Sequence, residues 1–473
     1  MLFNSFIFVW FFLVVYGLYL LFRRSNRAQN WLLLIGSYVF YGWWDWRFLM
    51  LLWTSTAIDF VVARALDTTT VKRRRTWLLL VSISANLAIL GTFKYFNFFA
   101  ESFEPVLRTF GLQPDFVTLK LILPVGISFY TFQSMGYTID VFRKRIPANK
   151  NLLQYALYVA FFPQLVAGPI ERAANLLPQI KRKRIITSAQ VNAGLSLIIW
   201  GFFKKMVIAD QLGLIADELF DGHSELEGME SFVAVLAFTG QIYGDFSGYS
   251  DIARGLAKLM GFELMVNFKL PYFATNPAEF WTRWHVSLSS WIRDYLYIPL
   301  GGNRNGKFRT YINLMVVMAL AGLWHGAAWN FVIWGAYHGV ALVIHRIWND
   351  ARVGTGTSLA LSSRLRFWAQ VAVMFAVTSV GWLIFRSDSV TQIGDMITSA
   401  SPTFTEDSLR LGYKLAFFAA PLVIVQLVQH RTNDLMIMTK APRIVQAVIY
   451  GFFLIWIVIF SLREPSEFIY FQF

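Results

Sequence analysis

Two histidines lie inside a long apolar stretch of the sequence, where an ionisable side chain is costly. His325 and His338 occur in GLWHGAAWNFVIWGAYHG, within the apolar residues 311–347. Ionisable groups at membrane depth indicate a function by default, although a neutral histidine can also hold helices together. Burial disfavours the imidazolium, so such a side chain is a neutral base suited to deprotonating a hydroxyl or thiol during acyl transfer. His325 is the stronger candidate, since Gly326 and the small residues 327–328 leave room for a ligand.

Other chemistries find little support in the sequence. It contains no His-Glu-x-x-His zinc motif, no P-loop and no Gly-x-Ser-x-Gly motif. No carboxylate lies at ligand spacing from His285, His325 or His338, so we expect no metal site. The chain has no cysteine, so a covalent acyl intermediate would have to use His, Ser, Thr or Tyr. The pair Gly301–Gly302 beside Arg304 is compatible with phosphate binding, with a tight turn as the alternative.

The composition is that of a membrane protein. Of 473 residues, 56% are hydrophobic and only 15% are charged, whereas soluble proteins average about 25% charged residues. So apolar a sequence is not disordered. The formal net charge is +14, but the basic residues are scattered between long apolar runs, so we expect no nucleic-acid partner.

The apolar runs predict an all-α fold, a polytopic integral membrane helix bundle with about 11–12 transmembrane helices. The first run lacks a basic n-region and a cleavage site, so we interpret it as an uncleaved span rather than a signal peptide. The runs cover residues 2–22, 31–43, 47–66, 77–99, 120–141, 188–209, 231–247, 311–328, 329–347, 367–386, 411–429 and 444–462.

The charges between the runs predict an orientation. Seven clusters hold 26 of the 42 basic residues, and alternating the spans places all seven on the same side. The opposite loops are acidic: residues 210–230 carry seven carboxylates and no Lys or Arg. By the positive-inside rule, both termini are therefore expected to be extracytoplasmic.

Two segments do not fit simple crossings. Residues 152–170 are apolar but lie between basic clusters, and Pro163 and Pro169 would break a helix there. We expect a re-entrant segment that is buried in protein. Residues 272–310 predict a cytoplasmic-side region with an amphipathic helix over 278–297, on which His285 lies at the border of the tryptophan-rich face.

Several charged residues lie within apolar segments, where a charge needs an ion-pair partner or access to lipid headgroups. Lys204 and Lys205 lie near the outer end of a span, and we expect them to extend to the lipid headgroups. Asp245 and Asp251 are expected to pair with Arg254, or alternatively to line a polar cavity.

The motifs together resemble those of a known family. PAEFWTRWHVSLSSWIRDYLYIPLGGNR, followed by GLWHGAAWNFVIWGAYHG, is similar to the membrane-bound O-acyltransferase superfamily. LPVGISFYTFQSMGYTIDVFR, FFPQLVAGPIERA and YGDFSGYSDIARGLAKLMGFELMVNFKLPYFATNP resemble the bacterial branch that includes the membrane component of alginate O-acetylation. The resemblance extends over most of the chain and is weakest at 98–118, 210–230 and 387–443.

The resemblance implies a single membrane domain over residues 1–473, in the bacterial inner (cytoplasmic) membrane and surrounded by its lipid. It implies that His325, in the Trp-His-Gly motif, is the catalytic base or relay, and that His285, in Arg-Trp-His, is the second family histidine. On the cytoplasmic side, Arg283, Arg293 and Arg304 could attract the phosphates of coenzyme A.

The resemblance also implies a reaction. The acyl donor would be acetyl-CoA, which is a substrate, and we expect no bound cofactor. The acetyl group would cross the membrane to a periplasmic SGNH-hydrolase-like acetyltransferase or another acyl acceptor protein, for O-acetylation of an exported, alginate-like polysaccharide.

Two alternatives remain open from the sequence. Within the family, the chain could serve the D-alanylation of teichoic acid, with the acyl group taken from a carrier protein. From another class, it could be a transporter of a polysaccharide or lipid-linked sugar. Transporters often contain paired broken helices, and segment 152–170 has no matching twin.

Overall fold

The computed structural model describes residues 1–111, 122–166, 168–352, 362–462 and 466–471. Over these residues the fold is helical, without a β-strand; Gly228 and Ala400 form an isolated β-bridge. The predicted all-α fold class is confirmed. Within the described residues, six helical stretches are long and apolar enough to cross a membrane: Phe48–Thr68, Lys72–Thr109, Ser188–Asp221, Ser363–Arg386, Glu406–Thr432 and Arg443–Phe460.

The chain divides into two compact units. The first comprises Met1–Val191 and Leu256–Met265, and the second comprises Asn192–Gly255 and Val266–Phe473. The single membrane domain over residues 1–473 and the full number of crossings stay predictions.

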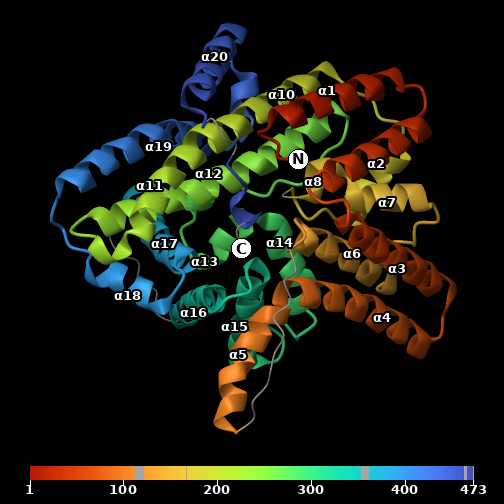
Figure 1. Ribbon diagram of the computed structural model, residues 1–473, viewed down its shortest axis with the longest axis horizontal. Coiled ribbons are helices and arrows are strands. Elements are labelled where there is room, and N and C mark those ends of the chain that lie inside the picture. The colour runs from red at the N-terminus through yellow and green to blue at the C-terminus, as the bar shows by residue number, and fades with distance from the viewer. Residues whose placement is uncertain (112–121, 167, 353–361, 463–465, 472–473) are drawn as a thin grey trace. The chain divides into compact units, whose positions relative to one another are not determined.

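In the first unit, α3, α4 and α6 pack side by side (Figure 1). The carboxylate of Asp59 on α3 joins them, because it accepts hydrogen bonds from Ser82 and Asn86 on α4 and from Ser134 on α6. These donors make the buried carboxylate tolerable. The helices of this unit are α1 (Phe6–Leu21), α2 (Asn26–Gly42), α3 (Phe48–Thr68), α4 (Lys72–Leu90), α5 (Phe96–Thr109), α6 (Ile127–Phe142), α7 (Leu152–Ala160), α8 (Phe162–Leu165) and α9 (Ala173–Lys181).

The segment expected to re-enter consists of two short helices, α7 and α8, with a break at Phe161. Pro163 lies in the first turn of α8, where a missing N–H is tolerated. Residues 155–166 are buried, as expected for irregular backbone surrounded by protein. Its path in a membrane stays a prediction, and position 167 lies outside the described residues.

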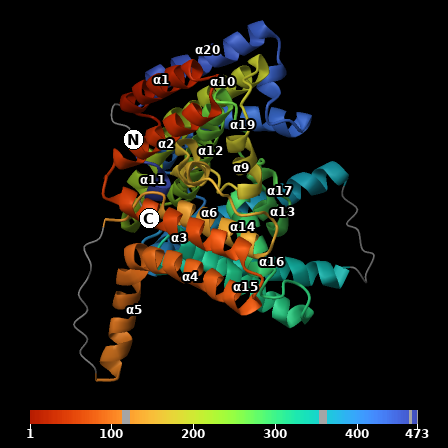
Figure 2. The same ribbon diagram turned by 90° about the vertical axis from the view of Figure 1, so that its right-hand side faces the viewer.

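The second unit contains the longest helices. It holds α10 (Ser188–Phe202, from Asn192 onward), the π-helix η2 (Phe203–Ala209), α11 (Asp210–Asp221), α12 (Glu230–Leu259, up to Gly255), α13 (Pro277–Arg283), α14 (Val286–Ile292), η5 (Arg293–Tyr297), α15 (Gly306–His325), α16 (Trp329–Arg352), α17 (Ser363–Arg386), α18 (Val390–Thr398), α19 (Glu406–Thr432) and α20 (Arg443–Phe460). Figure 2 shows α15 and α16 lying side by side, with the connection between them running from Gly326 to Ala328.

Glycines let α10 and α12 approach closely. A Cβ on Gly201 would lie 2.7 Å from the carbonyl oxygen of Gly248, and one on Gly248 would lie 2.8 Å from the carbonyl oxygen of Gly201. Small residues at such a crossing are typical of helices that pack within a membrane. The close crossing fixes α12, which supplies several residues of the candidate site.

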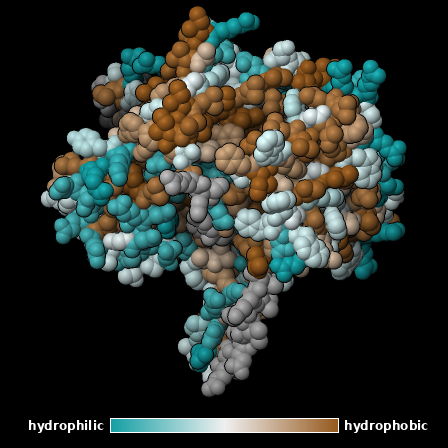
Figure 3. Space-filling model, turned by 45° about the horizontal axis from the view of Figure 1, so that its top comes forward, coloured by the Kyte–Doolittle hydropathy of each residue, from teal (hydrophilic) through white to brown (hydrophobic). Residues whose placement is uncertain are grey.

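Apolar side chains cover much of the face seen in Figure 3. On α20, at least two-thirds of the surface is exposed at each of Ile444, Val448 and Val458. The same holds on α1 for Phe6 and Trp10. Such apolar outer faces are those of helices that contact lipid rather than water.

Candidate active site

The second unit brings His285 and His325 together in its interior. Their ring centroids lie 6.5 Å apart, and the side chains are 0% and 3% exposed. His325 is the last residue of α15, and His285 immediately precedes α14. Trp324 contacts both rings, with centroid distances of 5.7 Å to His285 and 5.1 Å to His325. The two histidines of the Trp-His motifs therefore share one buried centre.

The amphipathic helix predicted over 278–297 is wrong as a continuous element. The chain leaves α13 after Arg283, and His285 adopts left-handed backbone angles with φ at +42°. Such angles are unfavourable for a residue with a side chain. Asn267 holds the turn: its carbonyl accepts from the N–H of Val286 at 3.0 Å, and its side-chain oxygen accepts from Ser287 at 3.2 Å. The break turns His285 inward, whereas a regular helix would leave it at the edge of the apolar face.

Burial determines the protonation of His285. It lowers the pKa of this imidazole from 6.5 to about 3, so the ring is neutral near pH 7. The ring packs edge-on against Phe246 of α12, with a centroid distance of 4.7 Å. A neutral imidazole in apolar surroundings can accept a proton or orient a neighbouring group.

The space beside His325 differs from the expectation. The small residues after it were expected to leave room for a ligand, but the ring of Phe331 occupies the place of a Cβ on Gly326. Gly326 is therefore required for close packing of the α15–α16 turn. His325 is enclosed by aromatic rings on several sides, with centroids of Trp334, Phe385 and Tyr470 at 5.0, 5.4 and 5.3 Å.

Tyr470 is a site residue that sequence reasoning missed. Its ring lies 5.3 Å from His325 and 4.7 Å from Phe246, measured between centroids. Its hydroxyl oxygen is buried and has no hydrogen-bond partner among the described residues. Burial raises the pKa of this phenol, so it remains protonated and can donate a hydrogen bond. A hydroxyl group thus lies next to the candidate base.

A buried ion cluster holds the segment that carries Tyr470. The ammonium of Lys205 lies 2.9 Å from Asp210 and 2.7 Å from Asp245. The same ammonium donates to the Ser466 hydroxyl at 2.9 Å, and Asp245 accepts from the backbone N–H of Ile469 at 2.7 Å. The cluster therefore fixes residues 466–469, and with them the position of Tyr470.

The expectation that the two lysines reach the headgroups is wrong. Both lysines are buried in η2, where the wide π-helical turn points their side chains in different directions. The ammonium of Lys204 lies 2.7 Å from Asp251, whereas Lys205 belongs to the ion cluster with Asp210 and Asp245. The predicted pair of Asp251 with Arg254 is present at 2.9 Å, whereas Asp245 pairs with Lys205 instead. An ammonium buried this deeply is tolerable only with such partners.

The three arginines expected to attract coenzyme A differ in their surroundings. Arg283 forms an ion pair with Glu279 at 2.6 Å and donates to the carbonyls of Lys269 and Leu270. Arg293 is exposed and contacts its neighbour Asp294, and Arg304 is exposed in the glycine turn. The hydrogen bonds and the ion pair of Arg283 thus stabilise the backbone that precedes His285. The binding of coenzyme A phosphates by the three arginines stays a prediction.

The remaining histidines lie apart from this pair. His338, one helical turn beyond Trp334 on α16, is fully buried among aromatic rings, including Phe280 and Trp281. His223 lies near Asp395, and His430 stacks on Phe273 and Phe367. Among the described residues, no three His, Asp or Glu side chains form a group that could hold a metal ion. The arrangement favours proton transfer by imidazole, with a hydroxyl group adjacent.

Comparison with known proteins relates these features to a family. The sequence model of the membrane-bound O-acyltransferase (MBOAT) family matches residues 67–375. A probable alginate O-acetylase of Pseudomonas putida is 43% identical over 393 residues, which are 82% of this chain and 78% of the relative. A peptidoglycan O-acetyltransferase of Helicobacter pylori is 36% identical over 423 residues, covering 82% and 78%. A teichoic acid D-alanyltransferase of Streptococcus thermophilus is 28% identical over 252 residues, covering 49% and 59%.

Proposed function

Because the chain belongs to the membrane-bound O-acyltransferase family and is an O-acyltransferase of the membrane, we propose that it serves the O-acetylation of an exported polysaccharide. The acetyl group comes from cytoplasmic acetyl-CoA and crosses the inner membrane to a periplasmic acceptor protein of the SGNH-hydrolase type. The polysaccharide is alginate-like, a choice supported by the probable alginate O-acetylase that matches over most of both chains.

One observation carries the proposed chemistry: two buried histidines and a tyrosine hydroxyl lie in one centre. His325 acts as general base and removes the proton from the acceptor hydroxyl as its oxygen attacks the thioester carbonyl. The C–S bond then breaks, and the proton passes from the imidazolium to the thiolate of coenzyme A. A positioned base of this kind contributes about 10²–10⁴-fold to the rate.

His285 and Tyr470 support that step. The neutral His285 ring stabilises the position of Trp324 and His325 through ring packing, and the Tyr470 hydroxyl donates to the oxygen that becomes negative in the tetrahedral intermediate. Direct transfer is our first choice. If the transfer passes through a covalent acyl-protein intermediate, Tyr470 is the candidate nucleophile, because its ring contacts His325.

The sidedness of the charges supports the direction of transfer. The basic clusters favour a donor entry on the cytoplasmic side, and the exposed side chains of Arg293 and Arg304 would attract the phosphates of acetyl-CoA there. The acidic segment 210–230, which begins with α11, then lies on the periplasmic side, toward the acceptor protein.

The D-alanylation of teichoic acid is the alternative within the family. It is less well supported, because the D-alanyltransferase matches only about half of this chain at 28% identity. A non-enzymatic transporter is disfavoured by the family and by the acetyltransferase relatives.

The experiment uses the full-length chain in proteoliposomes. Labelled acetyl-CoA is supplied on one face, and a purified SGNH-type acetyltransferase is supplied on the other. We expect label to reach that acceptor and free thiol to appear, with no transfer from a D-alanyl carrier protein. Transfer from the carrier alone would favour the alternative, and undiminished transfer by His325→Ala would contradict the assigned base.

A further inference from the structure

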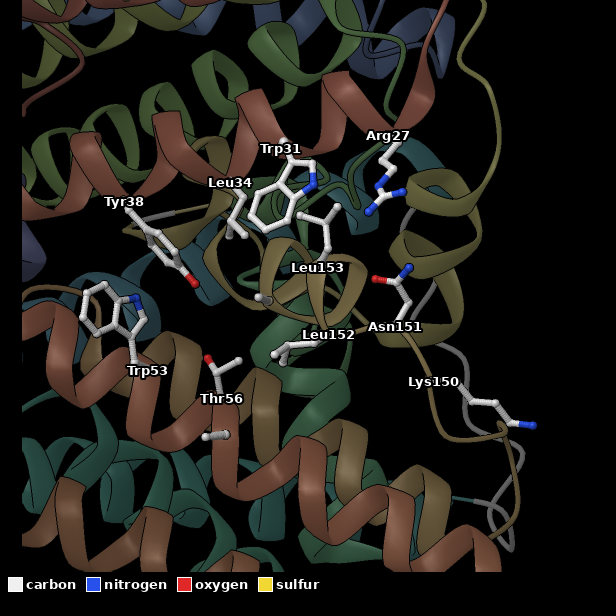
Figure 4. Close-up of a pocket in the computed structure, with 12 residues that line it drawn as sticks. Arg27, Trp31, Leu34, Tyr38, Trp53, Thr56, Lys150, Asn151, Leu152 and Leu153 are labelled. Atoms are coloured by element: carbon white, nitrogen blue, oxygen red, sulfur yellow. The ribbon is translucent and has the colours of Figure 1, made fainter.

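A groove in the first unit has an apolar floor and a basic end. It lies between α2, α3 and the start of α7 and has a volume of about 890 Å³ (Figure 4). Along α2 it extends from Arg27 to Tyr38, which corresponds to about 16 Å of helix. Trp31, Trp53, Ala57, Lys150, Leu152 and Leu153 also line it.

The two ends of the groove differ in chemistry. Figure 4 shows the rings of Tyr38 and Trp53 at one end, where they meet edge-on with centroids 5.7 Å apart. At the other end the guanidinium of Arg27 points toward Asn151, and Lys150 extends outward from the rim. Leu153 and Trp31 lie between the ends. The groove therefore has the polarity of a lipid molecule, with an apolar length and one charged terminus.

The described part of the chain does not neutralise the charge at the basic end of the groove. Among the described residues that line the groove there is no carboxylate. The guanidinium of Arg27 and the ammonium of Lys150 form no hydrogen bond or ion pair with any described residue, and both side chains are exposed. Two cations so placed attract a ligand with net negative charge.

We propose that this groove is a binding site for an anionic glycerophospholipid. One acyl chain lies along the apolar floor between Trp31 and Leu153 and ends against Tyr38 and Trp53. The phosphate is bound by Arg27, with Lys150 adding charge at the rim. The site is independent of the acyl-transfer chemistry proposed above, because every lining residue belongs to the first unit and the histidine pair to the second.

A lipid fits this groove better than a water-soluble anion does. The groove is formed by helices with apolar, exposed side chains: Trp31 and Trp53 are each 47% exposed, and Leu152 is 53% exposed. A phosphate ion would use only the Arg27 end and leave these surfaces bare. Both basic residues also belong to clusters predicted on the cytoplasmic side, whose lipid leaflet carries the anionic headgroups.

The test is native mass spectrometry of the full-length chain in detergent. It is titrated with phosphatidylglycerol and with phosphatidylcholine of identical acyl chains, and inorganic phosphate is a third probe. We expect phosphatidylglycerol to bind with preference and Arg27→Gln/Lys150→Gln to weaken it roughly tenfold to thirtyfold. Ala57→Phe, which fills the groove from α3, is expected to weaken both lipids, and millimolar phosphate to displace neither.

Two matched controls separate the groove from general surface effects. Arg73→Gln/Arg74→Gln removes two equally exposed charges elsewhere, and Ala88→Phe adds the same ring to an exposed alanine on α4. Both are expected to bind like the parent chain, and all variants to elute as the parent does in gel filtration. Equal losses from the paired controls, displacement by phosphate, or no loss in Ala57→Phe would each overturn the proposal.

Discussion

The imidazole rings of His285 and His325 lie 6.5 Å apart at an angle of 50°, although they come from different elements of the second unit. The distance lies within the range of direct contact between rings, and both side chains are shielded from solvent. In such surroundings the positions of donors and acceptors are fixed before a substrate arrives.

Replacing His325 by alanine is expected to lower acyl transfer about 10²–10⁴-fold, because it removes the group that we propose deprotonates the acceptor. His325→Gln should be equally impaired, since an amide keeps much of the shape but cannot take the proton. The readout is thiol release from acetyl-CoA by proteoliposomes containing an acceptor. His223→Ala, in the acidic loop region and away from the site, is the control and should transfer at the parent rate.

The folded protein should lose stability as the pH falls from 7 to 5, partly through His285. Its pKa of about 3 lies below the ordinary 6.5, so between these values the unfolded chain binds more protons than the folded chain. The stabilisation is complete above pH 6.5 and is lost through this window, by about 2 kcal/mol at pH 5. Thermal unfolding in detergent should therefore show a smaller pH dependence in His285→Gln. An unchanged slope would argue against a buried neutral imidazole.

Lys205→Met is expected to destabilise the chain by about 3–5 kcal/mol, because it leaves the carboxylates of Asp210 and Asp245 buried without a cation. Acyl transfer should fall as well, since the cluster positions the segment with Tyr470. Denaturant unfolding and transfer are both measured. Arg410→Met removes a cation from an exposed pair with Glu218 and should change little. Full stability in Lys205→Met would show that the cluster is not structural.

Tyr470→Phe should preserve the fold and reduce transfer, because the ring contacts remain while the hydroxyl is lost. We expect about a 10²-fold loss, similar to the removal of one donor to an oxyanion. Mass spectrometry of peptides after incubation with acetyl-CoA distinguishes the two routes. An acetylated Tyr470 would establish an acyl-protein intermediate in place of direct transfer, and parent-like activity would exclude this hydroxyl from both.

Gly326→Ala is expected to cost about 1–3 kcal/mol, because its methyl group would collide with the ring of Phe331. The same collision should displace His325 and lower transfer. Phe331→Leu combined with Gly326→Ala should recover part of both losses, since the smaller side chain makes room. Gly394→Ala on α18, where nothing lies within 4 Å of the added carbon, is the matched control. Equal costs at the two glycines would contradict the steric explanation.

The positions of the helices could be predicted from the sequence, because long apolar runs leave the chain few alternatives in lipid. Their ends were harder to place. α12 continues to Leu259, well beyond the apolar run that ends at 247, because Asp251 and Arg254 pair with each other and Asp251 with Lys204 instead of ending the helix. Charged residues therefore indicate the end of a buried helix only when the fold supplies no partner of opposite charge for them.

The candidate site could be predicted only in part. The two Trp-His motifs predict His285 and His325 as site residues, and the structure places these residues together. The inward turn at His285 depends on hydrogen bonds to Asn267, and no local sequence pattern predicts these bonds. Tyr470 lies far along the chain in a short apolar segment. Tertiary contacts bring it to the site, among them those of Lys205 and Asp245 with its segment and its own ring contact with Phe246. Spacing rules cannot detect residues that tertiary contacts bring together.

Helix α12 is a common support for groups that come from three other parts of the second unit. Ser250 accepts from the side chain of Asn267, which holds the turn at His285, while Phe246 packs against the His285 ring and Asp245 binds the backbone of Ile469. Any displacement of α12 would carry His285 and Tyr470 along as a rigid body. His325, on α15, would not follow by these contacts. A change in the spacing of His285 and His325 would therefore require α15 to move relative to α12, and hydrogen exchange at the α15–α16 turn would report such a motion.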